Sequence, residues 1–456
     1  MPAQADPFDE ANVLGGKRLA GGTVSVSGFK HSLVTVFAAC LALDAEVAID
    51  DCPDIDETRV LARLVNSLGG RARYASATLH LDPRGMANPI LDRDEAERVH
   101  GSLYLVPALL ARFGRAQLLS GRGGCQIGGG TGGARPVRHY VRVLERFGAR
   151  EVRDGDGGLS MTISSGLRPC TIDLLDFCAD PHARTGPHYS GASKMAVLAA
   201  AMTEGTSYLS NLYPKSDVRD LLDFVARAGA EICDDGSGTV SIRGGVVGAS
   251  LPVRFTLTPD LIEIVTYAAA AALLCEDRLT LRMNSAERAL AGLHPELAAL
   301  ERLGVKVAGD GQEVTVDRCA PARPGEFVSR STGLYSDSLP FLLLLALTAP
   351  GSSRLVDTVW RDRFGYVREL HAIGASCREL GPGDWSVRGP WSPTRAQQPL
   401  CATDLRGAAA LLLASLAVDG PTRIKGLRHL ARGYPDLVGR LVGLGARIDV
   451  DGGSAR

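Results

Sequence analysis

The sequence lacks several features that would each indicate a common class of protein. Its ten cysteines include no CxxC pair, and the N-terminal segment MPAQADPFDE has no basic stretch followed by an apolar one. We therefore expect a reduced, cytoplasmic protein without a disulfide framework or a zinc site. The longest apolar runs, near residues 264–275 and 339–349, are too short to span a bilayer. A net charge of −1, without long blocks of one sign, argues against nucleic acid as a partner.

What the chain does have is length and a repeated pattern. Its 456 residues exceed what one hydrophobic core usually supports, so two domains or a repeat architecture are expected. Six times, at intervals of about 75 residues, an amphipathic segment ends in an apolar residue and a glycine before a strand-like stretch. Glycine at this point suits the left-handed conformation that ends a helix. The six glycines are Gly69, Gly148, Gly229, Gly304, Gly374 and Gly445.

A second set of helical segments precedes these and is apolar nearly all round, which indicates burial. Each repeat thus reads as a buried helix, a strand, an amphipathic surface helix and one or two further strands. Six such units divide naturally into two domains of three repeats, with helices inside and sheets outside. An ordinary doubly wound sheet would instead need surface-patterned helices throughout. The apolar segments are residues 32–43, 102–113, 193–202, 264–275, 339–347 and 407–418.

Charged or polar residues stand just before the buried helices. Because helix N-termini carry free N–H groups and partial positive charge, several of them together predict an anion site. The acidic and hydroxyl residues could equally be N-caps. Lys30 and Arg406 cannot be explained in that way, since a cation there opposes the helix dipole. The residues in these positions are Lys30, His31, His100, Ser190, Ser193, Lys194, Asp260, Glu263, Asp337, Asp404 and Arg406.

Residues 118–140 set a lone cysteine, Cys125, among eight glycines. Glycines at this density permit positive φ and suit a loop that bends tightly or closes over a ligand. A disordered linker is the alternative, but the apolar run 102–113 and the amphipathic segment 137–147 flank this stretch. We interpret it as a reactive lid.

Several ordered motifs resemble those of the enolpyruvyl transferases, nearest to the UDP-N-acetylglucosamine enolpyruvyl transferases and more distantly EPSP synthase. The resemblance implies an α/β fold of two inside-out α/β barrel domains, each of three repeats with buried helices and outer sheets. It further implies a discontinuous domain of residues 1–29 plus 258–456 and an inserted domain, 30–257, that carries the Cys125 loop. The motifs are SVSGFKHSL at 25–33, GGCQIG and ARPV within 123–137, TPDLIE at 258–263, DRFGYVREL at 362–370, CATDLR at 401–406 and ARGY at 431–434.

The resemblance also implies a reaction. The enolpyruvyl group of phosphoenolpyruvate moves to an acceptor hydroxyl through a tetrahedral ketal, and phosphate is released. Cys125 corresponds to the family's general acid and covalent trap, and Asp337 to the carboxylate that deprotonates the acceptor. No cofactor or metal is implied, and no membrane partner. The basic residues that match those holding phosphoenolpyruvate are Lys30, Arg135, Arg363, Arg406 and Arg432.

Positions that contact the acceptor depart from the family pattern, whereas the uracil-binding edge Arg135-Pro136-Val137 is retained. The departures include an insertion at residues 129–133, and we expect Tyr189 to fill space that a hexose diphosphate needs. The leading hypothesis is therefore transfer to a uridine nucleotide, as in nikkomycin- and polyoxin-type antibiotic pathways that modify UMP at its 3′-hydroxyl. The alternatives are an ordinary peptidoglycan enzyme and a catalytically silent nucleotide-binding paralogue. The other residues predicted to bind substrate are His31, His100, Tyr189, Ser190, Gly191 and Asp404.

Other chemically notable residues are expected to be structural. Cys40, Cys275 and Cys401 lie in or beside apolar runs and are interpreted as packing thiols. His182, His188 and His429 are expected to be structural or to contact the acceptor.

Overall fold

The computed structural model describes residues 9–99, 101–118, 137–152 and 158–450. The chain forms two compact units: residues 28–258, here called the inserted unit, and residues up to 27 together with those from 259 onward, called the terminal unit. The predicted boundaries, 1–29 plus 258–456 and 30–257, lie close to these limits. The division into these two domains stays a prediction.

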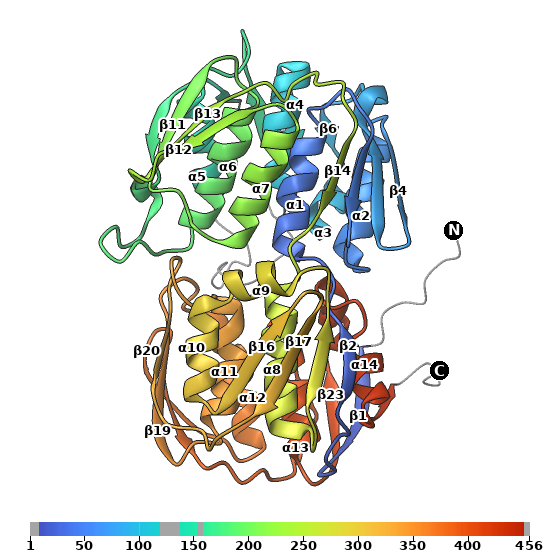
Figure 1. Cartoon of the computed structure of the whole chain (residues 1–456), viewed down its shortest axis with the longest axis vertical. Coiled ribbons are helices and arrows are strands. Elements are labelled where there is room, and N and C mark those ends of the chain that lie inside the picture. The colour runs from blue at the N-terminus through green and yellow to red at the C-terminus, as the bar shows by residue number, and fades with distance from the viewer. Residues whose placement is uncertain (1–8, 100, 119–136, 153–157, 451–456) are drawn as a thin grey trace. The chain divides into compact units, whose positions relative to one another are not determined.

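The described residues of the inserted unit form three sheets of four strands, each with a parallel outer pair followed by two antiparallel pairings (Figure 1). Its strands are β3 (Val47–Asp50), β4 (Arg71–Ala75), β5 (Thr78–Asp82), β6 (Ile90–Leu91), β7 (Arg115–Leu118), β8 (Arg150–Val152), β9 (Leu159–Thr162), β10 (Thr171–Asp173), β11 (Thr206–Ser210), β12 (Glu231–Asp234), β13 (Thr239–Arg243) and β14 (Val253–Thr256). Its helices are α1 (Lys30–Cys40), α2 (Asp56–Ser67), α3 (Arg93–Arg98), α4 (Val106–Phe113), α5 (Arg138–Arg146), α6 (Tyr189–Ala201) and α7 (Ser216–Arg227).

The terminal unit repeats the same sheet pattern three times, and its N-terminal strand β1 completes the sheet of the last repeat by pairing with β23 and β24 (Figure 1). Its strands are β1 (Glu10–Gly15), β2 (Gly22–Ser25), β15 (Leu279–Arg282), β16 (Val305–Asp310), β17 (Glu313–Arg318), β18 (Glu326–Ser329), β19 (Gly351–Asp357), β20 (Ser376–Gly381), β21 (Asp384–Gly389), β22 (Leu400–Cys401), β23 (Gly420–Lys425) and β24 (Arg447–Val450). Its helices are α8 (Leu261–Leu274), α9 (Ala286–Gly292), α10 (His294–Arg302), α11 (Leu339–Ala346), α12 (Val367–Ala372), α13 (Leu405–Ala417) and α14 (Leu437–Gly443).

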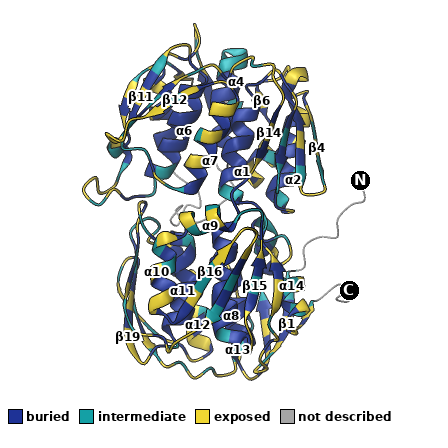
Figure 2. Cartoon of the chain, in the orientation of Figure 1, coloured by how far each residue is buried: buried dark blue, intermediate teal, exposed yellow. Residues whose placement is uncertain are grey.

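The apolar helices lie at the centre of each unit, as predicted. Helices α1, α6, α8, α11 and α13 are buried along almost their whole length, and exposed residues gather on outer strands and surface helices (Figure 2). The predicted helix 102–113 is divided into the 3-10 turn η2 (Ser102–Leu105) and α4. The proline at the start of α4 explains this division, because it lacks an N–H and favours the first turn of a new helix.

The six repeat-ending glycines all adopt positive φ, between 78° at Gly304 and 114° at Gly229. This conformation ends the preceding helix and turns the chain into the next strand, so the predicted repeat boundaries are confirmed.

Two of the three cysteines interpreted as packing thiols are buried, namely Cys40 and Cys275. The interpretation of Cys401 is wrong, because this residue is exposed. It follows Leu400 in the short strand β22, and alternate residues of a strand point to opposite faces, so Leu400 takes the inner position. No helix among the described residues is both long and apolar enough to cross a membrane.

Candidate active site

Asp337 of the terminal unit lies between two arginines. It belongs to the short 3-10 turn η5 (Ser336–Ser338), directly before α11. Arg363 Nη2 is 2.8 Å from Asp337 Oδ1, and Arg406 Nε donates to Oδ2 at 2.9 Å. Arg363 is 5% exposed and Arg406 is 1% exposed. Two buried arginines thus share one partly exposed carboxylate.

Arg406 lies in the first turn of α13, and its guanidinium carbon is 5.1 Å from the centre of the Tyr434 ring. The Tyr434 hydroxyl is 2.8 Å from Thr266 Oγ1 on α8. Burial alone would lower the pKa of Arg406, but Tyr434 and Asp337 hold that pKa above its ordinary value. Within the described part of the chain, Arg406 Nη1 and Nη2 have no hydrogen-bond partner. A charged guanidinium with two open nitrogens suits bidentate binding of an anion.

Lys30, the first residue of α1 in the inserted unit, is paired with an acidic residue. Its Nζ is 2.6 Å from Glu57 Oε2, and the two side chains are 12% and 5% exposed. Glu57 lies in the first turn of α2, where an acidic residue is ordinary because it complements the helix dipole. Nothing in the sequence therefore marks Glu57 as the partner of Lys30.

A second buried ion pair joins two helices of the inserted unit. Lys194 of α6 contacts Asp217 of α7, and these residues are 5% and 2% exposed. Burial by itself would raise the pKa of Asp217, yet the charges of Lys194, His31 and Lys215 hold that pKa below its ordinary value. The structure thus brings His31, at the start of α1, into the electrostatic surroundings of this pair.

Comparison with known proteins identifies the family of the chain. The family of EPSP synthase (3-phosphoshikimate 1-carboxyvinyltransferase) matches residues 13–441. UDP-N-acetylglucosamine 1-carboxyvinyltransferase 3 of Caldanaerobacter subterraneus subsp. tengcongensis is 32% identical over 440 residues, which cover 96% of this chain and 98% of that protein. The chain belongs to the enolpyruvyl transferase family. It is an enolpyruvyl transferase with phosphoenolpyruvate as donor of the transferred group.

Solved structures of enolpyruvyl transferases support the same assignment. The crystal structure of the enolpyruvyl transferase NikO from Streptomyces tendae matches with 41% sequence identity and a TM-score of 0.90, covering 97% of this chain and 99% of that one. An EPSP synthase from Acinetobacter baumannii shares the fold, with a TM-score of 0.66 at 15% identity and coverage of 97% and 100%. The predicted fold class, two inside-out α/β barrel domains of three repeats, is confirmed as that of this enolpyruvyl transferase family.

Several predicted site residues of this enolpyruvyl transferase fall outside the described part of the chain. They are Cys125, Arg135, Pro136 and His100. Val137 is described and is the residue directly before α5. Arg432 closes the 3-10 turn η7 (Leu427–Arg432), two residues before Tyr434.

Asp404 caps α13. Its Oδ1 accepts the N–H groups of Arg406 and Gly407, each at 3.0 Å. This is the N-cap interpretation that the sequence left open, and it gives Asp404 a clear role in fixing the backbone that carries Arg406.

Tyr189 and Gly191, both predicted to contact the acceptor, are closely packed. Tyr189 has no exposed surface, and its hydroxyl donates to the carbonyl oxygen of Asn211 at 2.6 Å. A side chain at Gly191 would meet His139 Nε2 at 2.7 Å and the Tyr140 hydroxyl at 2.8 Å. The structure thus places both residues in packing between elements of the inserted unit. Their roles at the acceptor stay predictions, and Ser190 is partly exposed.

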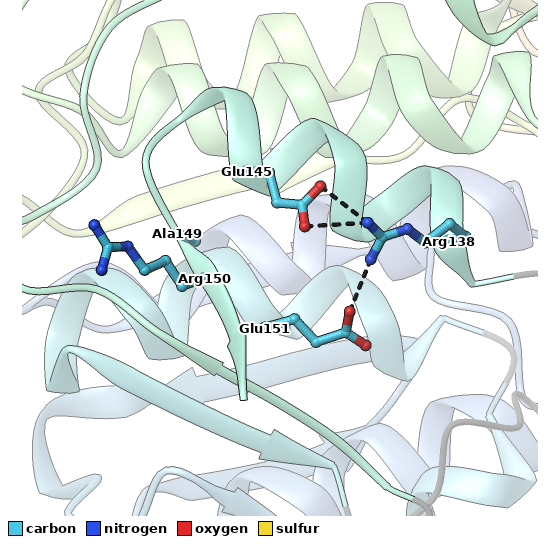
Figure 3. Close-up of a pocket in the computed structure, with 5 residues that line it drawn as sticks. All are labelled: Arg138, Glu145, Ala149, Arg150 and Glu151. Carbon is cyan, nitrogen blue, oxygen red and sulfur yellow. Dashed lines mark hydrogen bonds and ion pairs between the residues drawn. The ribbon is translucent and has the colours of Figure 1, made fainter. Parts of the chain in front are cut away.

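Three surface hollows contain none of the predicted site residues. One of about 620 Å³ beside α5 is lined by Arg138, Glu145, Ala149, Arg150 and Glu151. Figure 3 shows the Arg138 guanidinium between the two glutamates, 3.3 Å from Glu145 and 2.7 Å from Glu151. These exposed charges neutralise one another, so the hollow is an ordinary ion-paired surface. The other two hollows, of about 730 and 410 Å³, lie on the sheets containing β3 and β1.

No group of three or more His, Cys, Asp or Glu side chains in the described ranges is arranged to hold a metal ion. In the candidate site, Lys30 and Lys194 each pair with one carboxylate. Arg363 and Arg406 share the carboxylate of Asp337. The sequence did not reveal four of the carboxylates that matter here. Glu57 and Asp217 hold the lysines, and Glu296 and Asp357, described below, surround the Asp337 turn.

Proposed function

We propose that this enolpyruvyl transferase moves the enolpyruvyl group of phosphoenolpyruvate to a hydroxyl of a uridine nucleotide, the 3′-hydroxyl of UMP, and releases phosphate. The observation that best supports this chemistry is the cluster in which the buried Arg363 and Arg406 share the carboxylate of Asp337. The open Nη1 and Nη2 of Arg406 match two oxygens of a phosphate or carboxylate. Phosphoenolpyruvate carries both groups.

In the proposed reaction, Asp337 takes the proton of the acceptor hydroxyl while the acceptor oxygen bonds to the substituted carbon of phosphoenolpyruvate. Cys125 adds a proton to the methylene carbon, which gives a tetrahedral ketal. Loss of a proton from the new methyl group and of phosphate then restores the double bond. Arg363, Arg406 and Arg432 hold the anionic groups during both steps.

Lys30 contributes a second cation to the proposed binding of phosphoenolpyruvate. Its ammonium is held by Glu57, so an anionic ligand competes with this carboxylate for the same charge.

The choice of acceptor rests on the residues that depart from the family and on sequence identity. His31 replaces an asparagine, and Val99-His100-Gly101-Ser102 lacks the family's arginine, whereas Arg135-Pro136-Val137 is retained. The chain is 41% identical to NikO but 30% to 32% identical to the UDP-N-acetylglucosamine 1-carboxyvinyltransferases of Hyphomonas neptunium and Caldanaerobacter. We would expect the reverse order for an ordinary peptidoglycan enzyme.

Two alternatives remain. Transfer to UDP-N-acetylglucosamine is favoured by the similarity to the carboxyvinyltransferases along nearly the whole chain. A silent nucleotide-binding paralogue is disfavoured, because a protein without catalysis has no need of a carboxylate held between two buried arginines. The basic set Lys30, Arg363, Arg406 and Arg432, with Cys125, is also intact.

Phosphate release with UMP and with UDP-N-acetylglucosamine on one preparation tests the proposal. We expect a higher kcat/KM for UMP, no turnover with 3′-deoxy-UMP, and a product whose mass equals UMP plus one enolpyruvyl group less one hydrogen. A preference for the UDP-sugar would establish the first alternative. Release of phosphate with neither acceptor, together with retained nucleotide binding, would establish the second.

The proposed role of Cys125 has its own test. A thiol that acts as an acid can be replaced by a carboxyl group, so Cys125→Asp should keep measurable turnover. The same variant should no longer be alkylated by the epoxide fosfomycin. Normal turnover in Cys125→Ala, with labelling of another cysteine, would contradict the assignment.

A further inference from the structure

The turn that carries Asp337 is held from one side by a buried glutamate. Glu296, on α10, has no exposed surface. Its Oε1 accepts the backbone N–H of Tyr335 at 2.6 Å and the hydroxyl of Ser338 at 3.2 Å. These contacts fix the residue just before η5 and the residue just after Asp337.

A second buried carboxylate holds the same turn from another element. Asp357, at the end of β19, is 1% exposed, and its Oδ2 accepts the hydroxyl of Ser336, the residue directly before Asp337. Its Oδ1 accepts the hydroxyl of Ser329, on β18, at 2.7 Å. Residues on both sides of Asp337 are therefore bonded to carboxylates that come from distant parts of the sequence.

Asp357 also orders the segment that leads to Arg363. Its Oδ1 accepts the N–H groups of Val359 and Trp360 at 2.9 and 2.8 Å. The Trp360 carbonyl in turn accepts the N–H of Arg363 at 3.2 Å. Asp357 thus bonds Ser336, in the turn that carries Asp337, and also orders the segment before Arg363. The side chains of Asp337 and Arg363 lie 2.8 Å apart.

We propose that Asp357 and Glu296 are positioning residues of the reaction, which set the place of Asp337 relative to Arg363 and Arg406. Neither carboxylate contacts the reacting groups in this assignment, and both act through the backbone and hydroxyls of residues 335–338. The assignment rests on the proposed role of Asp337. A turn as short as η5 has few bonds of its own, so its two carboxylate partners decide where Asp337 points.

The two serines bonded to Asp357 provide a matched test. Ser336→Ala removes the contact that reaches the Asp337 turn, and Ser329→Ala removes a contact of the same carboxylate that does not. Both serines are buried, so both variants are expected to lower the melting temperature to a similar extent. We expect kcat to fall roughly 10- to 100-fold in Ser336→Ala alone, with KM for phosphoenolpyruvate little changed, because a misplaced reacting group affects the transition state more than binding.

A double-mutant cycle separates this role from the proposed function. Asp337→Asn should itself lower kcat strongly, and Ser336→Ala added to it should cause no further loss. Equal kcat losses in Ser336→Ala and Ser329→Ala, or an unchanged kcat in folded Ser336→Ala, would overturn the positioning role alone. Wild-type turnover in Asp337→Asn would overturn the base assignment and the positioning role with it.

Discussion

Two buried helices of the terminal unit, α8 and α13, begin differently from the buried helices α1 and α6 of the inserted unit. In the terminal unit, Asp260 and Asp404 cap α8 and α13, each accepting two backbone N–H groups. In the inserted unit, the residues before α1 and α6 are Phe29 and His188, and neither side chain caps its helix. The cap carboxylates of the terminal unit therefore occupy helix N–H groups, and an anion there depends on guanidinium side chains. The starts of α1 and α6 carry no such carboxylate, which favours anion binding there by backbone N–H groups.

The largest effect on activity should come from replacing the guanidinium of Arg406 in the terminal unit. Arg406→Lys removes the planar pair of Nη nitrogens and leaves a single ammonium. Loss of two charge-assisted hydrogen bonds, at about 1.5–3 kcal/mol each, should lower kcat/KM for phosphoenolpyruvate by roughly 10²–10⁴-fold. Steady-state phosphate release measures the change.

Arg354→Lys is a suitable control, since Arg354 is a surface arginine of the same unit with two acidic partners, Glu326 and Asp384. It should leave kcat/KM close to wild type. A loss in Arg406→Lys no larger than in this control would mean that the terminal unit does not bind the donor through Arg406.

The next largest effect is on the stability of the inserted unit. Asp217→Leu leaves Lys194 buried without its carboxylate, which typically costs about 3–5 kcal/mol. The double variant Lys194→Met, Asp217→Leu should recover most of that loss, because an apolar pair fills the same space. Hydrogen exchange of α6 and α7 would show the change in the inserted unit. Equal exchange in the single and double variants would show that the pair contributes no net stability.

The architecture could be predicted from the sequence because the signals for each helix lie within or directly beside that helix. Each repeat-ending glycine sits beside its own helix, and the apolar segments identify the buried helices without knowledge of their neighbours. The site was only partly predictable, since the partners of its cations are far away in the chain. Glu57 and Asp217 lie in the first turns of helices, where acidic residues are common for local reasons. The position of Tyr189 beside a predicted site also did not reveal that its ring is fully buried.

Two buried carboxylates, one in each unit, should respond to pH in opposite ways. Burial raises the pKa of Glu263, on α8, to about 7, although Arg440 opposes the change and Asp260 adds to it. The folded state therefore holds a proton on Glu263 between about pH 4.5 and 7 that the unfolded state releases, so stability falls as pH rises through this window. The pKa of Asp217 is lowered, so its contribution is present above its ordinary pKa of 3.8 and is lost only in more acidic solution.

We expect the terminal unit to lose about 2 kcal/mol between pH 5 and 7 from Glu263, because the two pKa values lie close to the ends of this range. The inserted unit should show no such loss from Asp217 over that range. Chemical denaturation of wild type and Glu263→Gln, with hydrogen exchange to identify the unit, measures the difference. A slope with pH that is the same in both proteins would contradict the assignment to Glu263.

The smallest effect should come from making α13 begin as α1 does, without a side-chain cap. Asp404→Ala should cost about 1 kcal/mol of stability, which is typical for a lost N-cap. Asp436→Ala removes the cap of the surface helix α14, whose carboxylate accepts the N–H of Gly439 at 2.9 Å, and should cost a similar amount. The two variants should differ in activity, because the Asp404 cap bonds the N–H of Arg406 itself. We expect KM for phosphoenolpyruvate to rise several-fold in Asp404→Ala and to stay unchanged in Asp436→Ala. Unchanged KM in both would mean that Asp404 serves only the helix and that Arg406 is held by Asp337 and Tyr434 without help from the cap.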